Sequence, residues 1–275
     1  MAKIHPTALV EGNVELADGV EIGAFTVIKG NVKIGKNTKI GNRVTILHNV
    51  EIGENCEIHD GCVIGDEPQH LRDKGLHGKV VIGNNTILRE YVTVNRGTDF
   101  DRKETRIGNN VFLMAYAHVA HDCIVGDNVI MANAATLGGH VVIENNVFLG
   151  GLSAVQQKCR VGAYAMVGGL SGVNKDVPPF TRAVGQHVEL RGLNYIALKR
   201  AGLNSEEIKL IEKAYRKLFR SSKKLEETVR EILEEFGGNP YVKHFCEFIL
   251  ESIKSGRGIA VDKKLKKLGI PKGEE

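Results

Sequence analysis

An aliphatic residue returns at every sixth position of this chain, and this period restricts the possible folds more than any other feature. A spacing of six matches neither an α-helix nor a strand with one buried face, whereas hexapeptide repeats are typical of β-helices. The period shifts or pauses at two insertions and otherwise continues to Val173. The aliphatic anchors are Ile4, Val10, Leu16, Ile22, Ile28, Ile34, Ile40, Ile46, Ile52, Ile58, Ile64, Ile82, Leu88, Val94, Ile107, Leu113, Val119, Val125, Met131, Leu137, Ile143, Leu149, Val155, Val161, Val167 and Val173.

Six residues can form one short strand and one corner, so three repeats predict a triangular coil of eighteen residues. Twenty-six anchors then predict between eight and nine coils, and strands stacked ~4.8 Å apart give a prism roughly 40 Å long. Each coil buries its anchors only with its neighbours, as in other solenoids. The usual rule for parallel crossovers would predict a right-handed winding. Many anchors are followed by Gly or Asn, for which we expect positive φ in the corners: Gly23, Gly35, Gly41, Asn84, Gly108 and Asn109.

Two polar segments, residues 67–79 and 98–105, interrupt the repeat. Loops on a rigid scaffold often carry function, so we expect these segments to contribute to a site. The alternative is that both are tolerated surface insertions.

After Val177-Pro178-Pro179 the hexapeptide period gives way to a helical one. We expect a short helix over 191–200 and apolar stripes over 208–219 and 225–236, and Asn239-Pro240 predicts the start of another helix. The sequence thus predicts a β-helix over 1–189, a helical domain over 190–256 and a loosely held Lys-rich tail over 257–275.

Bulk properties exclude several classes of protein. No long uncharged apolar run could span a bilayer, and a repeat that begins at Ile4 leaves no room for a signal peptide. A net charge of +4 is too weak and too mixed to indicate nucleic-acid binding; the basic residues of the helices would suit an acidic partner or a solvated surface. Five cysteines without CxxC pairing, two of them (Cys56 and Cys62) in inward slots, are typical of reduced core residues, and we expect a cytoplasmic protein.

The segment from Ala117 to Asp122 places two histidines, His118 and His121, and a carboxylate in one coil. Residues eighteen apart should lie above one another at roughly 5 Å intervals. Gly139 therefore lies over His121, and His140 over Asp122. One coil further, Gln157 joins the same column, with Gln156 and Lys158 beside it.

This column suits acyl transfer, because a histidine can activate a hydroxyl nucleophile, typically ~10²–10⁴-fold in rate. A neighbouring carboxylate can set its tautomer, and a glycine can expose a backbone N–H to a developing oxyanion. A zinc site is the alternative, but His118 and His121, three apart, would point in opposite directions on one strand. We therefore expect neither a metal nor a cofactor. Surface histidines without function are the remaining interpretation.

Three stretches closely resemble the bacterial UDP-N-acetylglucosamine O-acyltransferases, which catalyse the first step of lipid A synthesis. The resemblance extends from His5 to about Ser255, and it includes Gly185-Gln186-His187, Gly192-Leu193-Asn194 and Leu198-Lys199-Arg200 in the last third of the chain. The three stretches are Ala117-His118-Val119-Ala120-His121-Asp122-Cys123, Asn133-Ala134-Ala135-Thr136-Leu137-Gly138-Gly139-His140-Val141 and Val167-Gly168-Gly169-Leu170-Ser171-Gly172-Val173.

The resemblance implies a homotrimer of left-handed parallel β-helices with sites between subunits. It implies transfer of an (R)-3-hydroxyacyl chain from acyl carrier protein to the 3-position of UDP-N-acetylglucosamine. His121 then acts as general base, Asp122 as its neighbour and Gly139 as oxyanion donor, while Gly169 sets acyl length. The implied substrate contacts are Gln69, Arg72, His118, His140, Gln157, Asn194 and Arg200.

Three departures from the family pattern are His70, Gln156 and Lys158, and they leave the sugar open. Some relatives prefer an analogue with an amine at the 3-position, which gives an amide product. The pathway's later N-acyltransferase is a second enzyme alternative, although that class usually carries an extra N-terminal domain. A non-catalytic solenoid, such as an ice-binding β-helix, should show a flat array of Thr and no helical cap.

Overall fold

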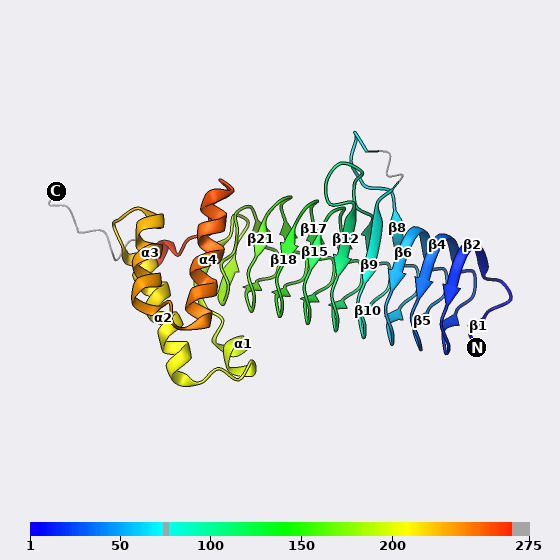
Figure 1. The fold of residues 1–275 in the computed structure, drawn as a ribbon, viewed down its shortest axis with the longest axis horizontal. Helices are drawn as coiled ribbons and strands as arrows, with labels where there is room; N and C mark the ends of the chain where they lie inside the picture. The colour runs from blue at the N-terminus through cyan, green and yellow to red at the C-terminus, as the bar shows by residue number, and fades with distance from the viewer. Residues whose placement is uncertain (74–76, 266–275) are drawn as a thin grey trace.

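The structure is a computed structural model, and it describes residues 1–73 and 77–265. A long solenoid of short parallel strands is followed at one end by a group of helices (Figure 1). In chain order the strands are β1 (Lys3–Ile4), β2 (Leu9–Leu16), β3 (Glu21–Ile22), β4 (Val27–Ile34), β5 (Lys39–Ile40), β6 (Thr45–Ile52), β7 (Glu57–Ile58), β8 (Val63–Asp66), β9 (Lys79–Ile82), β10 (Ile87–Leu88), β11 (Thr93–Asn95), β12 (Glu104–Ile107), β13 (Phe112–Leu113), β14 (His118–Val119), β15 (Ile124–Val125), β16 (Ile130–Met131), β17 (Thr136–Leu137), β18 (Val142–Ile143), β19 (Phe148–Leu149), β20 (Ala154–Val155), β21 (Arg160–Val161), β22 (Met166–Val167), β23 (Gly172–Val173), β24 (Thr181–Val184) and β25 (Glu189–Leu193).

The register of the strands confirms the eighteen-residue coil. His118 pairs with Thr136, and Thr136 pairs with Ala154, each eighteen residues further along the chain. Coils that carry an insertion are longer, so Ile58 pairs with Leu88. Each strand therefore lies beside its counterpart in the next coil, as predicted.

One face of the solenoid contains ten parallel strands, β1, β3, β5, β7, β10, β13, β16, β19, β22 and β24, and hence about ten coils. The prediction of eight to nine coils was too low because the anchor count stopped at Val173. A further coil follows without the aliphatic period: it buries Val177, Phe180 and Ala183. The left-handed winding stays a prediction.

The anchors form the core of the solenoid. From Ile22 onward every predicted anchor is buried, whereas Ile4 on the first coil is 47% exposed because no earlier coil covers it. Cys56 and Cys62 are buried and free, as expected.

The predicted positive φ at the residue after the anchor is wrong. Positive φ occurs three residues after most anchors instead, for example at Asn37, Asp122 and His140. Glycines such as Gly23 serve another purpose: a Cβ there would lie 2.5 Å from the carbonyl oxygen of Gly41. Close approach of successive coils, not backbone conformation, requires these glycines.

The solenoid ends with β24, and β25 folds back antiparallel to it. The helices with both ends among the described residues come next: α1 (Tyr195–Arg200), α2 (Ser205–Arg220), α3 (Leu225–Phe236) and α4 (Pro240–Lys254). The stripes over α2 and α3 and the Asn239 cap of α4 are confirmed. The helix predicted from 191 begins at Tyr195, because residues 191–193 belong to β25. The boundary predicted between residues 189 and 190 thus falls inside β25.

The segment after α4 is not a loose tail in its first part. Ile259, Ala260 and Asp262 are buried, and the amide of Ala260 donates to the carbonyl of Asp176 in the solenoid (2.8 Å). Tyr215 Oη also donates to Asp262 (2.8 Å). Residues 266–275 of the predicted tail lie outside the described residues.

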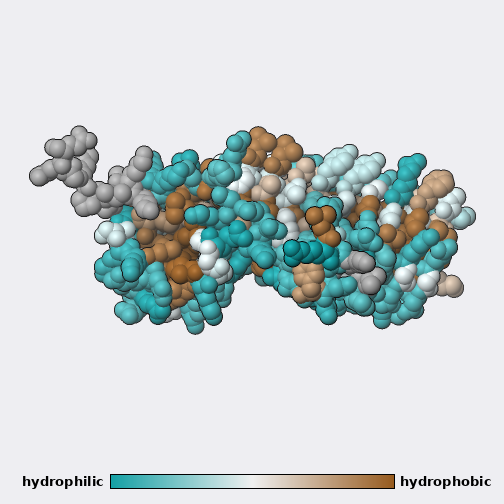
Figure 2. Space-filling view, turned by 90° about the horizontal axis from the view of Figure 1, so that it is seen from above, coloured by the Kyte–Doolittle hydropathy of each residue, from teal (hydrophilic) through white to brown (hydrophobic). Residues whose placement is uncertain are grey.

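Apolar side chains gather over the helical end of the molecule in Figure 2, whereas the solenoid shows separate apolar patches on a hydrophilic surface. Among the helices that the structure describes, none has the length and apolar character needed to cross a membrane.

Candidate active site

The predicted column is present at one corner of the solenoid. His121 and Asp122 follow β14, and Gly139 and His140 follow β17 in the next coil. The amide of His140 donates to the carbonyl of His121 (3.0 Å), and the amide of Lys158 donates to that of Gly139 (3.0 Å). The eighteen-residue period therefore brings together groups that are far apart in sequence.

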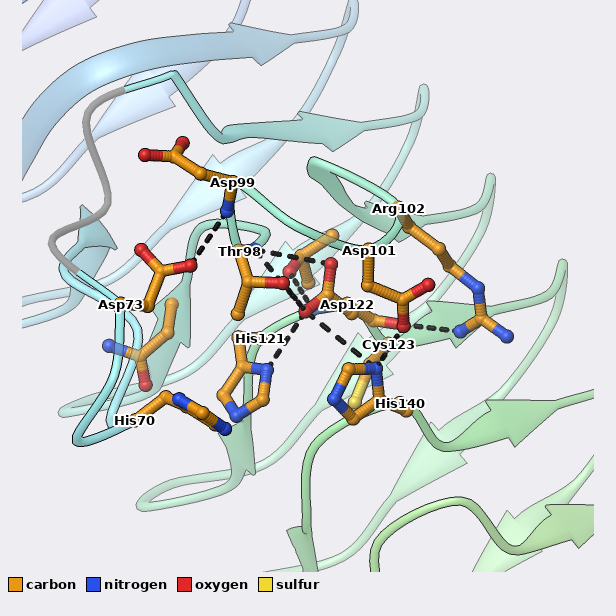
Figure 3. Close-up of polar contacts among 12 residues, drawn as sticks. His70, Asp73, Thr98, Asp99, Asp101, Arg102, His121, Asp122, Cys123 and His140 are labelled. Atoms are coloured by element: carbon orange, nitrogen blue, oxygen red, sulfur yellow. Dashed lines mark hydrogen bonds and ion pairs between the residues drawn. The ribbon is translucent and has the colours of Figure 1, made fainter.

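His121 and Asp122 form a buried pair (Figure 3). His121 Nδ1 lies 2.9 Å from Asp122 Oδ2. Because a carboxylate accepts hydrogen bonds, Nδ1 carries the proton in the neutral ring, and Nε2 is left as the basic nitrogen. The arrangement is that of an oriented general base.

Asp122 is held as a carboxylate by the start of the second loop. Thr98 donates to it twice, from Oγ1 (2.7 Å) and from its amide (3.1 Å), and the amide of Asp122 donates to Thr105 Oγ1 (2.9 Å). Burial opposes ionisation, but the hydrogen bonds from His121 and Thr98 outweigh it and hold the pKa of Asp122 below its usual value. Asp122 therefore remains ionised beside the imidazole.

Gly139 lies against the imidazole of His121. A Cβ at Gly139 would lie 2.4 Å from Cε1 and 2.7 Å from Nε2 of that ring, so no other residue fits without moving it. The backbone of Gly139 therefore borders the basic nitrogen.

The amide of Gly139 is also available. At some other corners the equivalent amide is capped from the next coil: Ala24 N–H donates to Asn42 Oδ1 (2.8 Å) and Glu54 N–H to Asn84 Oδ1 (2.8 Å). Eighteen residues after Gly139 stands Gln157, whose side chain is exposed. In the described part of the chain, no group accepts the Gly139 N–H. An oxyanion beside His121 could accept it.

Three further histidines surround His121. The ring of His140 lies 4.9 Å away and that of His70 5.5 Å away, both edge-on. His118 Nδ1 lies 2.7 Å from Thr93 Oγ1, and burial, followed by the proximity of His121, lowers the pKa of His118. A neutral His118 can position a hydroxyl without competing with His121 as a cation.

Both insertions contribute side chains to the site, so they are not merely tolerated surface insertions (Figure 3). The first supplies His70, with the exposed Gln69 and Arg72 beside it. The second supplies Thr98, and also the groups that contact the next coil: Asp101 Oδ2 lies 2.5 Å from His140 Nδ1, and Arg102 donates to the carbonyl of Asp122.

Not every predicted site residue lies at this corner. Asn194 caps α1 through the amide of Ala197, and its Nδ2 donates to the carbonyl of Tyr164 (2.9 Å). Asn194 and Arg200 line a separate pocket of about 390 Å³ between α1 and the face of β16, β19 and β22. Gly169 follows β22, at a different corner from His121. Within one chain these residues and His121 lie on different sides of the prism.

Ligand atoms of His121, Asp122 and His140 lie within 4.8 Å of one another, a spacing that a metal ion can bridge. However, Asp122 Oδ2 already contacts His121 Nδ1 (2.9 Å) and accepts from Thr98 Oγ1 (2.7 Å). A hydrogen bond therefore explains the proximity of His121 and Asp122, and the coil register, with its backbone bond from the His140 amide to the His121 carbonyl, explains that of His140.

Sequence reasoning missed Thr98, Thr105, Asp101 and Arg102. All four belong to the second insertion or its end, where the hexapeptide register is lost. No spacing rule relates them to His121, and only the departure from the repeat indicated that this segment had a purpose.

Comparisons with known proteins agree with the geometry. Residues 176–260 match the family model described as UDP-N-acetylglucosamine O-acyltransferase, domain 2, and residues 31–66 and 104–139 match the bacterial transferase hexapeptide model. An acyl-acyl-carrier-protein–UDP-N-acetylglucosamine O-acyltransferase of Aquifex aeolicus is 57% identical over 258 residues, which are 94% of this chain and 98% of the relative. One of Sulfurihydrogenibium sp. is 53% identical over 270 residues, 98% of each chain.

Solved structures give the same result. The UDP-N-acetylglucosamine acyltransferase of Francisella novicida superimposes with a TM-score of 0.90 at 34% identity, covering 99% of this chain and 100% of its own. That of Campylobacter jejuni gives 0.88 at 38% identity, covering 94% and 99%. With both domains matched along almost their full length, the chain belongs to the UDP-N-acetylglucosamine O-acyltransferase family.

Proposed function

We propose that this protein transfers a 3-hydroxyacyl chain from acyl carrier protein to the 3-hydroxyl of UDP-N-acetylglucosamine, as the first step of lipid A synthesis. The observation that carries the proposal is the oriented, buried pair of His121 and Asp122 with the free amide of Gly139 beside it. Family membership supports the choice of donor and acceptor.

His121 Nε2 removes the proton of the sugar 3-hydroxyl as its oxygen attacks the thioester carbonyl. The Asp122 carboxylate stabilises the imidazolium that forms. The carbonyl oxygen becomes an oxyanion, which accepts the Gly139 N–H; one such donor is typically worth about 3–4 kcal/mol. The intermediate then collapses, the C–S bond breaks, and the imidazolium returns the proton to the departing thiolate.

The other predicted site residues hold the substrate in this proposal. His118 and His140 border His121 and contact the sugar, and Gln69, Arg72 and Gln157 lie on the loop and the coil around it. Arg200 binds the diphosphate, for which a guanidinium is well suited, and Asn194 shapes the same pocket.

Because Asn194, Arg200 and Gly169 lie away from His121 in one chain, we propose that three chains associate and that each site forms between neighbours. Gly169 then limits the acyl chain. Its missing side chain leaves the pocket deeper, and a Cβ there would already lie 3.3 Å from the Gly151 carbonyl oxygen, closer than an ordinary van der Waals contact.

The test is thiol release from 3-hydroxyacyl-acyl carrier protein in the presence of UDP-N-acetylglucosamine. Wild type should turn over, and His121→Ala should lower kcat by about 10²–10⁴-fold. His5→Ala, on the exposed first coil, is the matched control and should retain wild-type turnover. Unchanged kcat in His121→Ala would refute the base. If wild type transfers the acyl chain only to the 3-amino analogue of the UDP-sugar, the product is an amide and the proposed ester product is wrong.

A further inference from the structure

A ladder of peptide groups runs through the active-site column. The carbonyl of Gln157 and the amide of Lys158 belong to one peptide, and that amide donates to the Gly139 carbonyl (3.0 Å). The next peptide contributes the amide of His140, which donates to the His121 carbonyl (3.0 Å). The amide of Asp122 completes the ladder by donating to Thr105 Oγ1 (2.9 Å). Three peptide dipoles are thus aligned, and such chains reinforce one another.

At the Gln157 end, the next coil of the solenoid does not continue this ladder. The amide eighteen residues after Lys158 is that of Asp176, which by the same pattern should donate to the Gln157 carbonyl. It donates instead to the carbonyl of Gly258 (3.0 Å), in the segment after α4. At the neighbouring corner the pattern continues, since Phe180 N–H donates to Ala163 (2.8 Å). The active-site ladder thus loses its next coil.

Arg257 takes the place of the Asp176 amide as the donor to the Gln157 carbonyl. Its guanidinium Nη2 donates to the Gln157 carbonyl (3.0 Å), at the negative end of the aligned dipoles, where a cation is favourable. Gly256 and Gly258, which flank it, have φ of 74° and 73°, although a side chain at either would meet nothing within 4 Å. Glycine is therefore needed here for the shape of the turn, which aims Arg257 at the column.

We propose that Arg257 is a positioning residue for the reaction: it caps the ladder that holds Gly139 and His121 in register, and so links the C-terminal segment to the oxyanion site. The proposal rests on the proposed function only for its kinetic consequence. Its structural consequence, protection of the column amides, can be measured without activity.

The first measurement is hydrogen exchange resolved to single amides. In Arg257→Ala, the amides of Lys158 and His140 should exchange at least about 5-fold faster than in wild type. The amides of Asn128 and Asn146, which make the same ladder at the next corner, should not change. Equal protection of all four amides in both proteins would overturn the proposal, whether or not the enzyme transfers acyl groups.

The second measurement is kinetic. Arg257→Ala should lower kcat about 10-fold with little change in the KM for the UDP-sugar, Arg257→Lys should recover part of it, and added guanidinium should rescue Arg257→Ala more than equal sodium chloride. Arg230→Ala, which removes an exposed arginine of α3, should match wild type. Wild-type kcat in Arg257→Ala would refute the positioning role, whereas an inactive wild type would refute the proposed function instead.

Discussion

At the scale of single residues, Gly139 has little freedom to change. Alanine there would place its Cβ 2.4 Å from His121 Cε1 and displace the imidazole from the oxyanion site. We expect Gly139→Ala to lower kcat by about 10²–10³-fold, the range for losing one oxyanion donor. Gly238→Ala is the matched control, since a Cβ there meets nothing within 4 Å. Steady-state kinetics with a thermal melt would decide: a folded, fully active Gly139→Ala would contradict this role.

The same column shows what can be predicted from residues alone. The sequence alone places His121, Gly139 and Gln157 together, because residues eighteen apart in an unbroken repeat lie above one another in successive coils. Thr98 could not be placed this way, since it belongs to the second insertion. The expected positive φ at Gly23 failed for a different reason: sequence shows that a glycine is present but not whether φ or close approach requires it.

At the scale of elements, ion pairs join α4 to the solenoid. His244 Nε2 on α4 donates to Glu144 Oε2, which follows β18 (2.8 Å). This hydrogen bond raises the pKa of His244; although burial opposes ionisation of Glu144, the bond with His244 holds the pKa of Glu144 low. Arg160, whose own partner is Glu251 (2.8 Å), also faces Glu144 (3.6 Å).

The pH dependence follows from these directions. A raised pKa in His244 means that its contribution is complete below about pH 6.5 and is lost as pH rises through the folded-state pKa. Glu144 contributes above about pH 4.5 and loses its contribution on acidification. Between pH 6 and 9, wild type should lose about 0.5–1 kcal/mol of unfolding free energy relative to His244→Gln. Denaturant titrations at several pH values measure this difference. His5→Gln should show the same change of unfolding free energy with pH as wild type. If the unfolding free energies of wild type and His244→Gln change with pH in parallel, the contribution of the His244–Glu144 pair is refuted.

Elements with their own periodicity were predictable, and those defined by partners were not. Helices α2 and α3 carry apolar stripes, and Asn239-Pro240 predicts the start of α4. In contrast, residues 191–193 form a strand only because β24 lies beside them. Residues 257–262 have few apolar anchors, but the solenoid's last coil and Tyr215 offer them hydrogen bonds.

At the scale of the whole molecule, one edge of the prism is unusually apolar for a surface. The side chains are stacked because each stands three residues after an anchor on the same face. The edge consists of Tyr91, Tyr116, Leu152 and Leu170, which are 54%, 62%, 63% and 71% exposed. Tyr91 and Tyr116 stack at 5.3 Å, and Gly169 adjoins Leu170. A contiguous apolar strip of this kind indicates an interaction surface.

We expect a second copy of the chain to cover this edge, which would bring Gly169 of one chain toward His121 of another. Three chains of 30.0 kDa should then give about 90 kDa by light scattering.

Tyr116→Asp should shift the mass toward 30.0 kDa and lower activity in proportion, because a buried unpaired carboxylate is costly. Aspartate tolerates the φ of 64° at Tyr116, so the coil itself should survive. Asn110→Asp adds the same charge to an exposed corner of the same coil and should leave the trimer intact. A monomeric, fully active wild type would refute the shared site, because Arg200 and Gly169 then have no route to His121.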